Sequence, residues 1–81
     1  MSPVEISSYD DLLAALVARR RELGLSQCSL NIEAGTQDGY VSKIEARMRH
    51  LGPVSLPLIL AGLGLVLELE EIDEAAVSQA A

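Results

Sequence analysis

The chain has 81 residues, 49% of them hydrophobic, but only two are aromatic and both are Tyr, so we expect one small domain with an aliphatic core. The single cysteine, Cys28, excludes an internal disulfide framework, and the single histidine, His50, leaves no zinc site. We therefore expect no metal and no cofactor. We also expect no enzyme, because a lone Cys on a helix usually serves packing rather than catalysis. The net charge is -6, yet all six basic residues lie between Arg19 and Arg49 with only four acidic ones, which leaves that segment at +2 and does not exclude a nucleic-acid partner.

The N-terminal residues 1–7 lack the basic start and the apolar run of a signal peptide, which predicts a cytoplasmic protein. Within them Val4 and Ile6 alternate with an acidic residue, a pattern that allows a short edge strand. Ser8, with an acidic residue three positions later, resembles a capping box. The first helix should therefore begin near Tyr9.

Apolar residues then recur at helical spacing until Gly24, which should end this helix. They are Leu12, Leu13, Leu16, Val17 and Leu23. Arg20 falls on the same face, where an unpaired charge would be unfavourable, so it calls for a carboxylate partner. The alternative is that the aliphatic stem of Arg20 lies along the apolar surface and its charged end reaches water.

The next stretch, residues 25–45, predicts two short helices joined by a tight turn. Ser26 can cap the first of them, Gly35 supplies the backbone freedom that ends it, and Thr36 can cap the second, over about residues 37–46. The inward-facing residues of the pair are Leu30, Ala34, Val41 and Ile44. Such a pair needs flanking helices as a platform, and its geometry presents the second helix to a DNA groove.

This stretch resembles the helix-turn-helix of the lambda-repressor/Cro (XRE-type) family, over roughly residues 12–63. The matching positions are Arg20, Gly24, Leu25, Ser26, Gln27, Leu30, Ala34, Gly35, Val41, Ser42, Ile44 and Glu45. The resemblance implies an all-α, lambda-repressor-like bundle of about four helices that binds double-stranded DNA. It also implies that Arg20 forms a structural ion pair with Glu45. Two departures are Asn31, where a small Ala is usual, and Ile32, where a polar residue is common.

The resemblance and the helical spacing together give candidate DNA-contacting residues. Base-contacting candidates on the outward face of the second short helix are Gln37, Asp38, Gly39, Ser42 and Lys43. Candidates for the phosphate backbone are Gln27, Thr36, Arg47 and Arg49. The helix is a credible but not ideal base-contacting element, because its acidic residue repels phosphate and its glycine weakens a helix. Gln27 and the basic loop at residues 47–52 could equally be solvated surface.

Pro53 and Ser55 mark the start of a fourth helix, which should end near Gly62 or Gly64. The run from residue 51 to residue 67 carries no charge, but it is shorter than the ~20 apolar residues that a membrane span needs and contains several Gly and Pro. We therefore expect no membrane partner.

After the fourth helix the period changes to two: Leu65, Leu67 and Leu69 alternate with other residues, as in a half-buried strand. A lone strand in a helical chain has no partner, so we expect it to pair with the same strand of a second copy, and dimerisation would also help so small a domain. This end of the chain resembles HipB-like antitoxins. The predicted division is a DNA-binding domain with a dimerisation strand over residues 1–72 and a flexible tail over 73–81.

Two functions remain open from the sequence. The first is a homodimeric, sequence-specific DNA-binding regulator of transcription that binds an inverted-repeat operator, with an autorepressing antitoxin as one form of it. The alternative is a protein-binding antitoxin or antiactivator on the same scaffold, with weak or no DNA binding and a toxin or activator protein as its partner. The acidic net charge and Gly39 favour the second function, whereas the clustered Arg and Lys residues and the intact motif favour the first.

Overall fold

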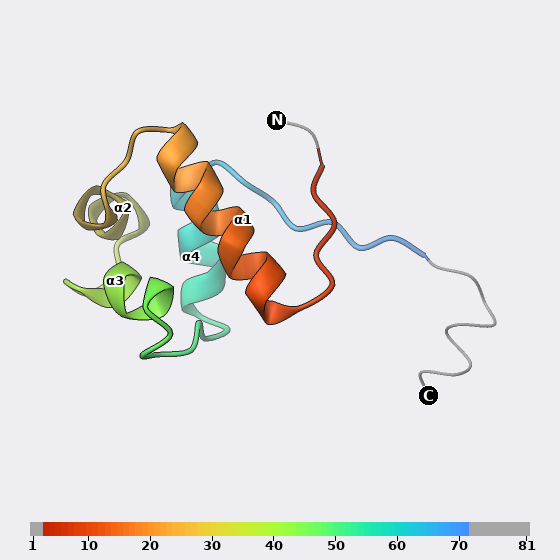
Figure 1. Ribbon diagram of the computed structural model, residues 1–81. Coiled ribbons are helices and arrows are strands. Elements are labelled where there is room, and N and C mark those ends of the chain that lie inside the picture. Colours follow the sequence, from red (N-terminus) through yellow and green to blue (C-terminus); the bar gives the residue numbers. More distant parts are fainter. Residues whose placement is uncertain (1–2, 72–81) are drawn as a thin grey trace.

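The computed structural model describes residues 3–71, and within them the chain forms four helices and no strand (Figure 1). The helices are α1 (Tyr9–Glu22), α2 (Gln27–Ala34), α3 (Tyr40–Glu45) and α4 (Ser55–Gly62). The prediction of an all-α domain of about four helices is confirmed. The predicted tail at residues 73–81 lies outside the described residues.

The helix ends follow the chemistry of their capping residues. The Ser8 hydroxyl accepts a hydrogen bond from the Asp11 N–H at 3.1 Å, and the Ser26 hydroxyl accepts one from the Ser29 N–H at 3.0 Å, so both predicted N-caps are confirmed. Helices α1, α2 and α4 are each followed by a glycine with positive φ. These glycines are Gly24, Gly35 and Gly64. Each allows the next residue's N–H to reach back to a carbonyl in the last helical turn.

The start of α3 differs from the prediction. The helix begins at Tyr40, not near residue 37, and Thr36 does not cap it, because Gly39 is the N-cap residue with a φ of 77°. The Asn31 side chain on α2 explains this. Its Oδ1 accepts hydrogen bonds from the Thr36 hydroxyl at 3.0 Å and from the Val41 N–H in the first turn of α3 at 3.1 Å. A cap supplied from the neighbouring helix thus replaces a local one.

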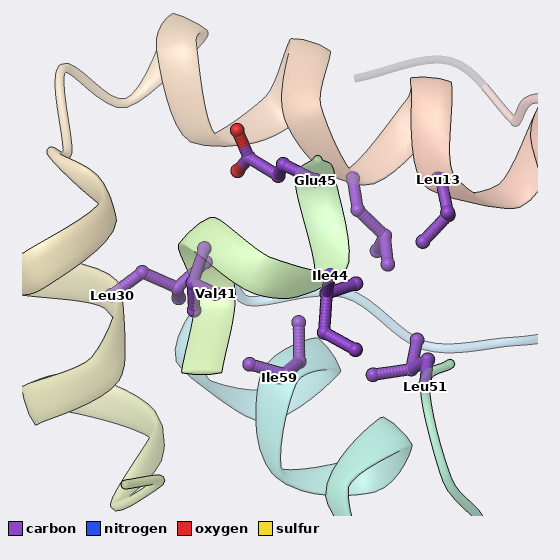
Figure 2. A pocket seen from close by; sticks show the side chains of 8 residues that line it. Leu13, Leu30, Val41, Ile44, Glu45, Leu51 and Ile59 are labelled. Carbon is purple, nitrogen blue, oxygen red and sulfur yellow. The ribbon is translucent and has the colours of Figure 1, made fainter. Parts of the chain in front are cut away.

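The core lies where the four helices meet and is aliphatic apart from Tyr40, as the composition predicts. Its buried apolar residues are Leu13, Leu16, Leu30, Ala34, Tyr40, Val41, Ile44, Ile59, Leu60 and Leu63. Figure 2 shows side chains from all four helices around a cavity of about 20 Å³, which has room for one water molecule at most. Helices α2 and α4 approach closely at Gly62, where an added Cβ would lie 3.2 Å from Leu30 Cδ1. The interior is therefore a packed platform for α3 rather than a ligand site.

Both ends of the described chain are extended. Residues 3–7 precede α1 and residues 65–71 follow α4, and Figure 1 shows both on the side of α1 away from α2 and α3. Residues 3–71 include neither the short edge strand predicted at residues 4–6 nor the strand predicted at residues 65–69, because no neighbouring strand in this part of the chain supplies hydrogen bonds. Pairing of the second segment across a dimer stays a prediction. Over residues 3–71, every helix is too short or too polar to cross a membrane.

Candidate nucleic-acid interface

A charged cluster fixes the end of α3 to α1 and α2. Arg20 on α1 donates to Glu45 on α3 through two nitrogens, with Nε 2.7 Å from Oε2 and the second nitrogen 2.9 Å from Oε1. Arg20 also donates to the Leu25 carbonyl at 2.9 Å, and the Gln27 amide donates to Glu45 Oε1 at 2.9 Å. The Arg20 and Glu45 side chains are only 11% and 15% exposed, so the carboxylate of α3 is held by groups from both preceding helices.

This environment changes the acidity of Glu45. Burial alone raises the pKa of its carboxyl group, but hydrogen bonds from Arg20 and Gln27 and the positive charges of Arg20 and Arg21 outweigh burial. The pKa of Glu45 therefore lies below its ordinary value. The carboxylate is therefore ionised at neutral pH, and both of its oxygens can accept the bidentate hydrogen bonds of the Arg20 guanidinium.

The proposed base-contacting positions fall into two structural groups. Gln37 and Asp38 are exposed in the turn ahead of α3, not on the helix as predicted. Gly39 is the left-handed residue at the start of the helix, so its role is to allow the turn rather than to weaken a helix interior. Ser42 and Lys43 lie on α3: Ser42 is partly buried and its hydroxyl donates to the Gly39 carbonyl at 2.9 Å, whereas Lys43 is exposed.

Two of the four phosphate candidates make side-chain hydrogen bonds to other side chains of the protein. The Gln27 amide donates to Glu45, and the Thr36 hydroxyl donates to Asn31 Oδ1. The sequence placed both residues at the candidate interface but gave no sign of these internal bonds. Their side chains position the α2–turn–α3 unit in the free protein.

The basic loop after α3 is tied to α1 and to the core. Arg47 lies 3.3 Å from Asp10 Oδ1, and the Arg49 guanidinium lies over the Tyr40 ring, 5.2 Å from its centre. His50 stacks on Tyr9 with 5.5 Å between ring centres. These contacts keep the loop against the N-terminal half of α1 while both arginines remain exposed.

Arg47 has an unusual backbone conformation. Its φ is 63°, the one positive value outside glycine among residues 3–71, and it stands where the other three helices have glycine. The N–H of the following residue, Met48, bonds to the Lys43 carbonyl at 2.9 Å and closes α3 as at the other helix ends. An arginine in this conformation is strained by about 1 kcal/mol or more relative to glycine. Its only ion pair within the described chain is with an exposed carboxylate, which offsets little of that strain.

Sequence reasoning missed the two tyrosines. Tyr40 is buried, and its hydroxyl bonds to the Ser55 hydroxyl at the start of α4, while Tyr9 accepts from the Leu51 N–H at 2.7 Å. The spacing of Tyr40 four residues before Ile44 is a signal for the buried position. The expectation that Cys28 serves packing is wrong, because this residue is exposed in the first turn of α2.

Comparison with known proteins supports a transcription-factor-like fold. A crystal structure described as a hypothetical transcription factor, NHTF, from Neisseria is similar to this chain, with a TM-score of 0.61 and 27% sequence identity. The similarity covers 82% of this chain and 80% of that chain. No family model matches the chain, and no curated protein sequence matches it either. The chain therefore shares its fold with a protein that is described as a hypothetical transcription factor.

Proposed function

We propose that the chain is a sequence-specific DNA-binding regulator of transcription of the lambda-repressor/Cro (XRE) type. The observation that carries this proposal is the way α3 is fixed at both ends. Asn31 holds its first turn, and the Arg20–Glu45–Gln27 cluster holds its last. A helix of six residues is not stable alone, so this fixation presents a short, rigid helix on the outside of the bundle, as base contact in a major groove requires.

The proposed contacts divide by chemistry. Gln37, Asp38 and Lys43 are exposed next to or on α3 and would contact base edges, while Ser42 and Gly39 let the backbone come close. The list of proposed phosphate contacts is Gln27, Thr36, Arg47 and Arg49. The strained conformation of Arg47 supports its place in this list. Glycine would adopt the same backbone conformation without strain, so the advantage of arginine here has to come from its side chain.

A homodimer would place two α3 helices on half-sites about one helical turn, roughly 34 Å, apart, so the operator would be an inverted repeat. An antitoxin that represses its own operon is one form of this function. In this proposal residues 1–72 form the DNA-binding and dimerising domain, and residues 73–81 form its tail.

The test is a gel-shift titration and footprint with DNA from upstream of the gene that encodes this chain, at low salt. Lys43→Ala should weaken binding by about 1 to 3 kcal/mol and relax preference at particular base pairs, whereas Arg49→Ala should weaken all sequences alike. Glu33→Ala, which removes an exposed charge on α2, is the matched control. Binding without any sequence preference would reject the proposal.

A protein-binding antitoxin or antiactivator is the second candidate function. Ile32 is 74% exposed on α2, and Asp38 places a negative charge beside α3. An apolar residue and a carboxylate at this surface suit a protein partner better than phosphate. An Ile32→Lys variant separates the two functions, because it should strengthen binding to DNA and weaken binding to a protein at this face.

A further inference from the structure

The single histidine of the chain, His50, lies in the basic loop at residues 47–52. It directly follows Arg49 and directly precedes Leu51, which packs against the core. His50 is exposed, but its ring is held in place, because it stacks on Tyr9 with 5.5 Å between ring centres and 22° between ring planes. A ring that is held by its face keeps both nitrogens, which lie on its edge, open to another partner.

Tyr9 is itself tied to the loop that it supports. Its hydroxyl accepts a hydrogen bond at 2.7 Å from the N–H of Leu51, one residue after the histidine. The next residue of α1, Asp10, pairs with Arg47 at 3.3 Å. The first turn of α1 therefore contacts the loop at three points, and these contacts fix the place of His50 relative to Arg47 before any DNA is bound.

The charged groups next to the stacked pair are Asp10 on α1 and the two arginines of the loop, Arg47 and Arg49. The Asp10 carboxylate is paired with Arg47, and the Arg49 guanidinium lies over an aromatic ring of α3. Within residues 3–71, no carboxylate forms an ion pair with His50. A DNA phosphate held by the two arginines would supply the negative charge that this ring lacks, and a negative charge favours the protonated form of a histidine.

We propose that His50 is a further phosphate contact that binds DNA in its protonated form, so that the affinity for DNA rises as the pH falls. This inference rests on the proposed function and adds to it one residue and a dependence on pH. Histidine is the side chain that ordinarily changes its charge between about pH 5 and 8. Each bound chain then takes up at most one proton, which limits the gain in affinity to about tenfold per chain for each pH unit.

A pH effect can be assigned to one residue because the chain has a single histidine. Carboxyl groups ordinarily titrate below about pH 5, and thiols and the α-amino group titrate above about pH 7.5. Burial raises the pKa of Glu45, but hydrogen bonds from Arg20 and Gln27 lower it below its ordinary value. The ion pair that holds α3 therefore stays intact at about pH 5.5.

The test is a fluorescence anisotropy titration of the full chain with labelled duplex DNA, at constant ionic strength and at about pH 7.5 and about pH 5.5. One duplex comes from upstream of the gene that encodes this chain, and the other is a scrambled duplex of the same length. The wild-type chain should bind both duplexes about three- to tenfold more tightly per bound chain at the lower pH, because a phosphate contact carries no sequence information. A gain confined to the upstream duplex would indicate a base contact and would overturn the phosphate assignment.

Two substitutions separate the charge of His50 from its stacking. His50→Phe keeps an aromatic ring on Tyr9 but cannot carry a proton, so its affinity should not rise at the lower pH. His50→Lys is positively charged at both pH values. It should bind more tightly than the wild type at about pH 7.5, and its slope of affinity against salt concentration, on logarithmic scales, should exceed that of His50→Phe by about one unit per chain. Circular dichroism melts at both pH values check that each variant is folded. A His50→Phe variant that keeps the wild-type gain would overturn the inference.

The outcomes also separate this inference from the proposed function. Sequence-specific binding without a gain that depends on His50 rejects the inference alone. A gain that depends on His50, in a protein that binds both duplexes equally, rejects the proposed function alone. The absence of binding to either duplex rejects both.

Discussion

The Arg20–Glu45 pair offers a quantitative test of how α3 is held. Glu45→Ala removes the acceptor of three hydrogen bonds and leaves Arg20 uncompensated at 11% exposure. Breaking a buried ion pair from one side costs about 3 to 5 kcal/mol, and the residual exposure of both partners places this one near 3 kcal/mol. For a domain of 60 to 100 residues, that loss corresponds to a fall in Tm of roughly 12 to 24 °C.

The assay is a double-mutant cycle by urea denaturation. Arg20→Ala should also cost about 3 kcal/mol, and the double variant about 4 kcal/mol, since neither charge is then left alone; the coupling energy is about 2 kcal/mol. The matched control is Glu22→Ala, which removes the more exposed partner of the 2.6 Å pair with Arg19 on α1, while Arg19 keeps its hydrogen bond to the Leu63 carbonyl; it should cost at most about 1 kcal/mol. Coupling below about 0.5 kcal/mol would refute the reasoning.

The same pair predicts a dependence on pH. Because the pKa of Glu45 is lowered in the folded chain, its contribution to stability is fully present above the pKa of the unfolded chain, about 4.3, and is lost as the pH falls through the folded value. Glu45→Gln removes this contribution. The difference in unfolding free energy between the wild type and this variant should therefore be constant from pH 7 to about 5 and shrink below about pH 4. A difference that widens on acidification would contradict the assigned direction.

Substitutions at three further positions test the local geometry. Arg47→Gly should raise the free energy of unfolding by about 0.5 to 1 kcal/mol, because glycine adopts the positive φ without strain. It should also reduce the slope of DNA-binding affinity against salt concentration, on logarithmic scales, by about one unit. Arg47→Ala should change this slope but not the stability. Asn31→Ala should cost about 1 to 3 kcal/mol in denaturant titrations, because it leaves a buried N–H of α3 unpaired. Gly62→Ala should cost about 1 to 3 kcal/mol of unfolding free energy, although alanine has the better helix propensity. The new Cβ would lie 3.3 Å from the backbone nitrogen of Ala34, which cannot move aside. A more stable variant would contradict the close approach of α2 and α4.

The ends of α1 and α2 were predictable because their signals are local. Ser8 and Ser26 cap helices by hydrogen bonds within three residues, and Gly24 and Gly35 end them by a conformation that glycine adopts freely. The start of α3 was not predictable in this way. Its cap is Asn31, which lies ten residues before the N–H that it satisfies, and no periodic pattern reports a bond between two helices.

The candidate site shows the same division. The need of Arg20 for a carboxylate follows from its place on an apolar face, and the structure supplies that carboxylate from Glu45. The internal bonds of Gln27 and Thr36 follow from how α2 and α3 cross, which spacing alone does not give. The left-handed conformation of Arg47 was hidden for another reason: arginine in this conformation has no sequence signature, so only the backbone shows it.

The arrangement links dimerisation to DNA contact through α1. Its Arg20 holds Glu45, and its Leu12 and Leu16 line a surface hollow together with the extended residues that precede α1 and follow α4. One helix therefore lies between the segment proposed for dimerisation and the proposed DNA contact. Figure 1 shows α3 on one side of this helix and the extended residues 3–7 and 65–71 on the other. A second copy joined through residues 65–69 would therefore leave both α3 helices uncovered, as simultaneous contact with two half-sites requires. Because α1 is fixed to α3 by partly buried, charge-assisted bonds, the two helices should move together when a dimer contacts two half-sites.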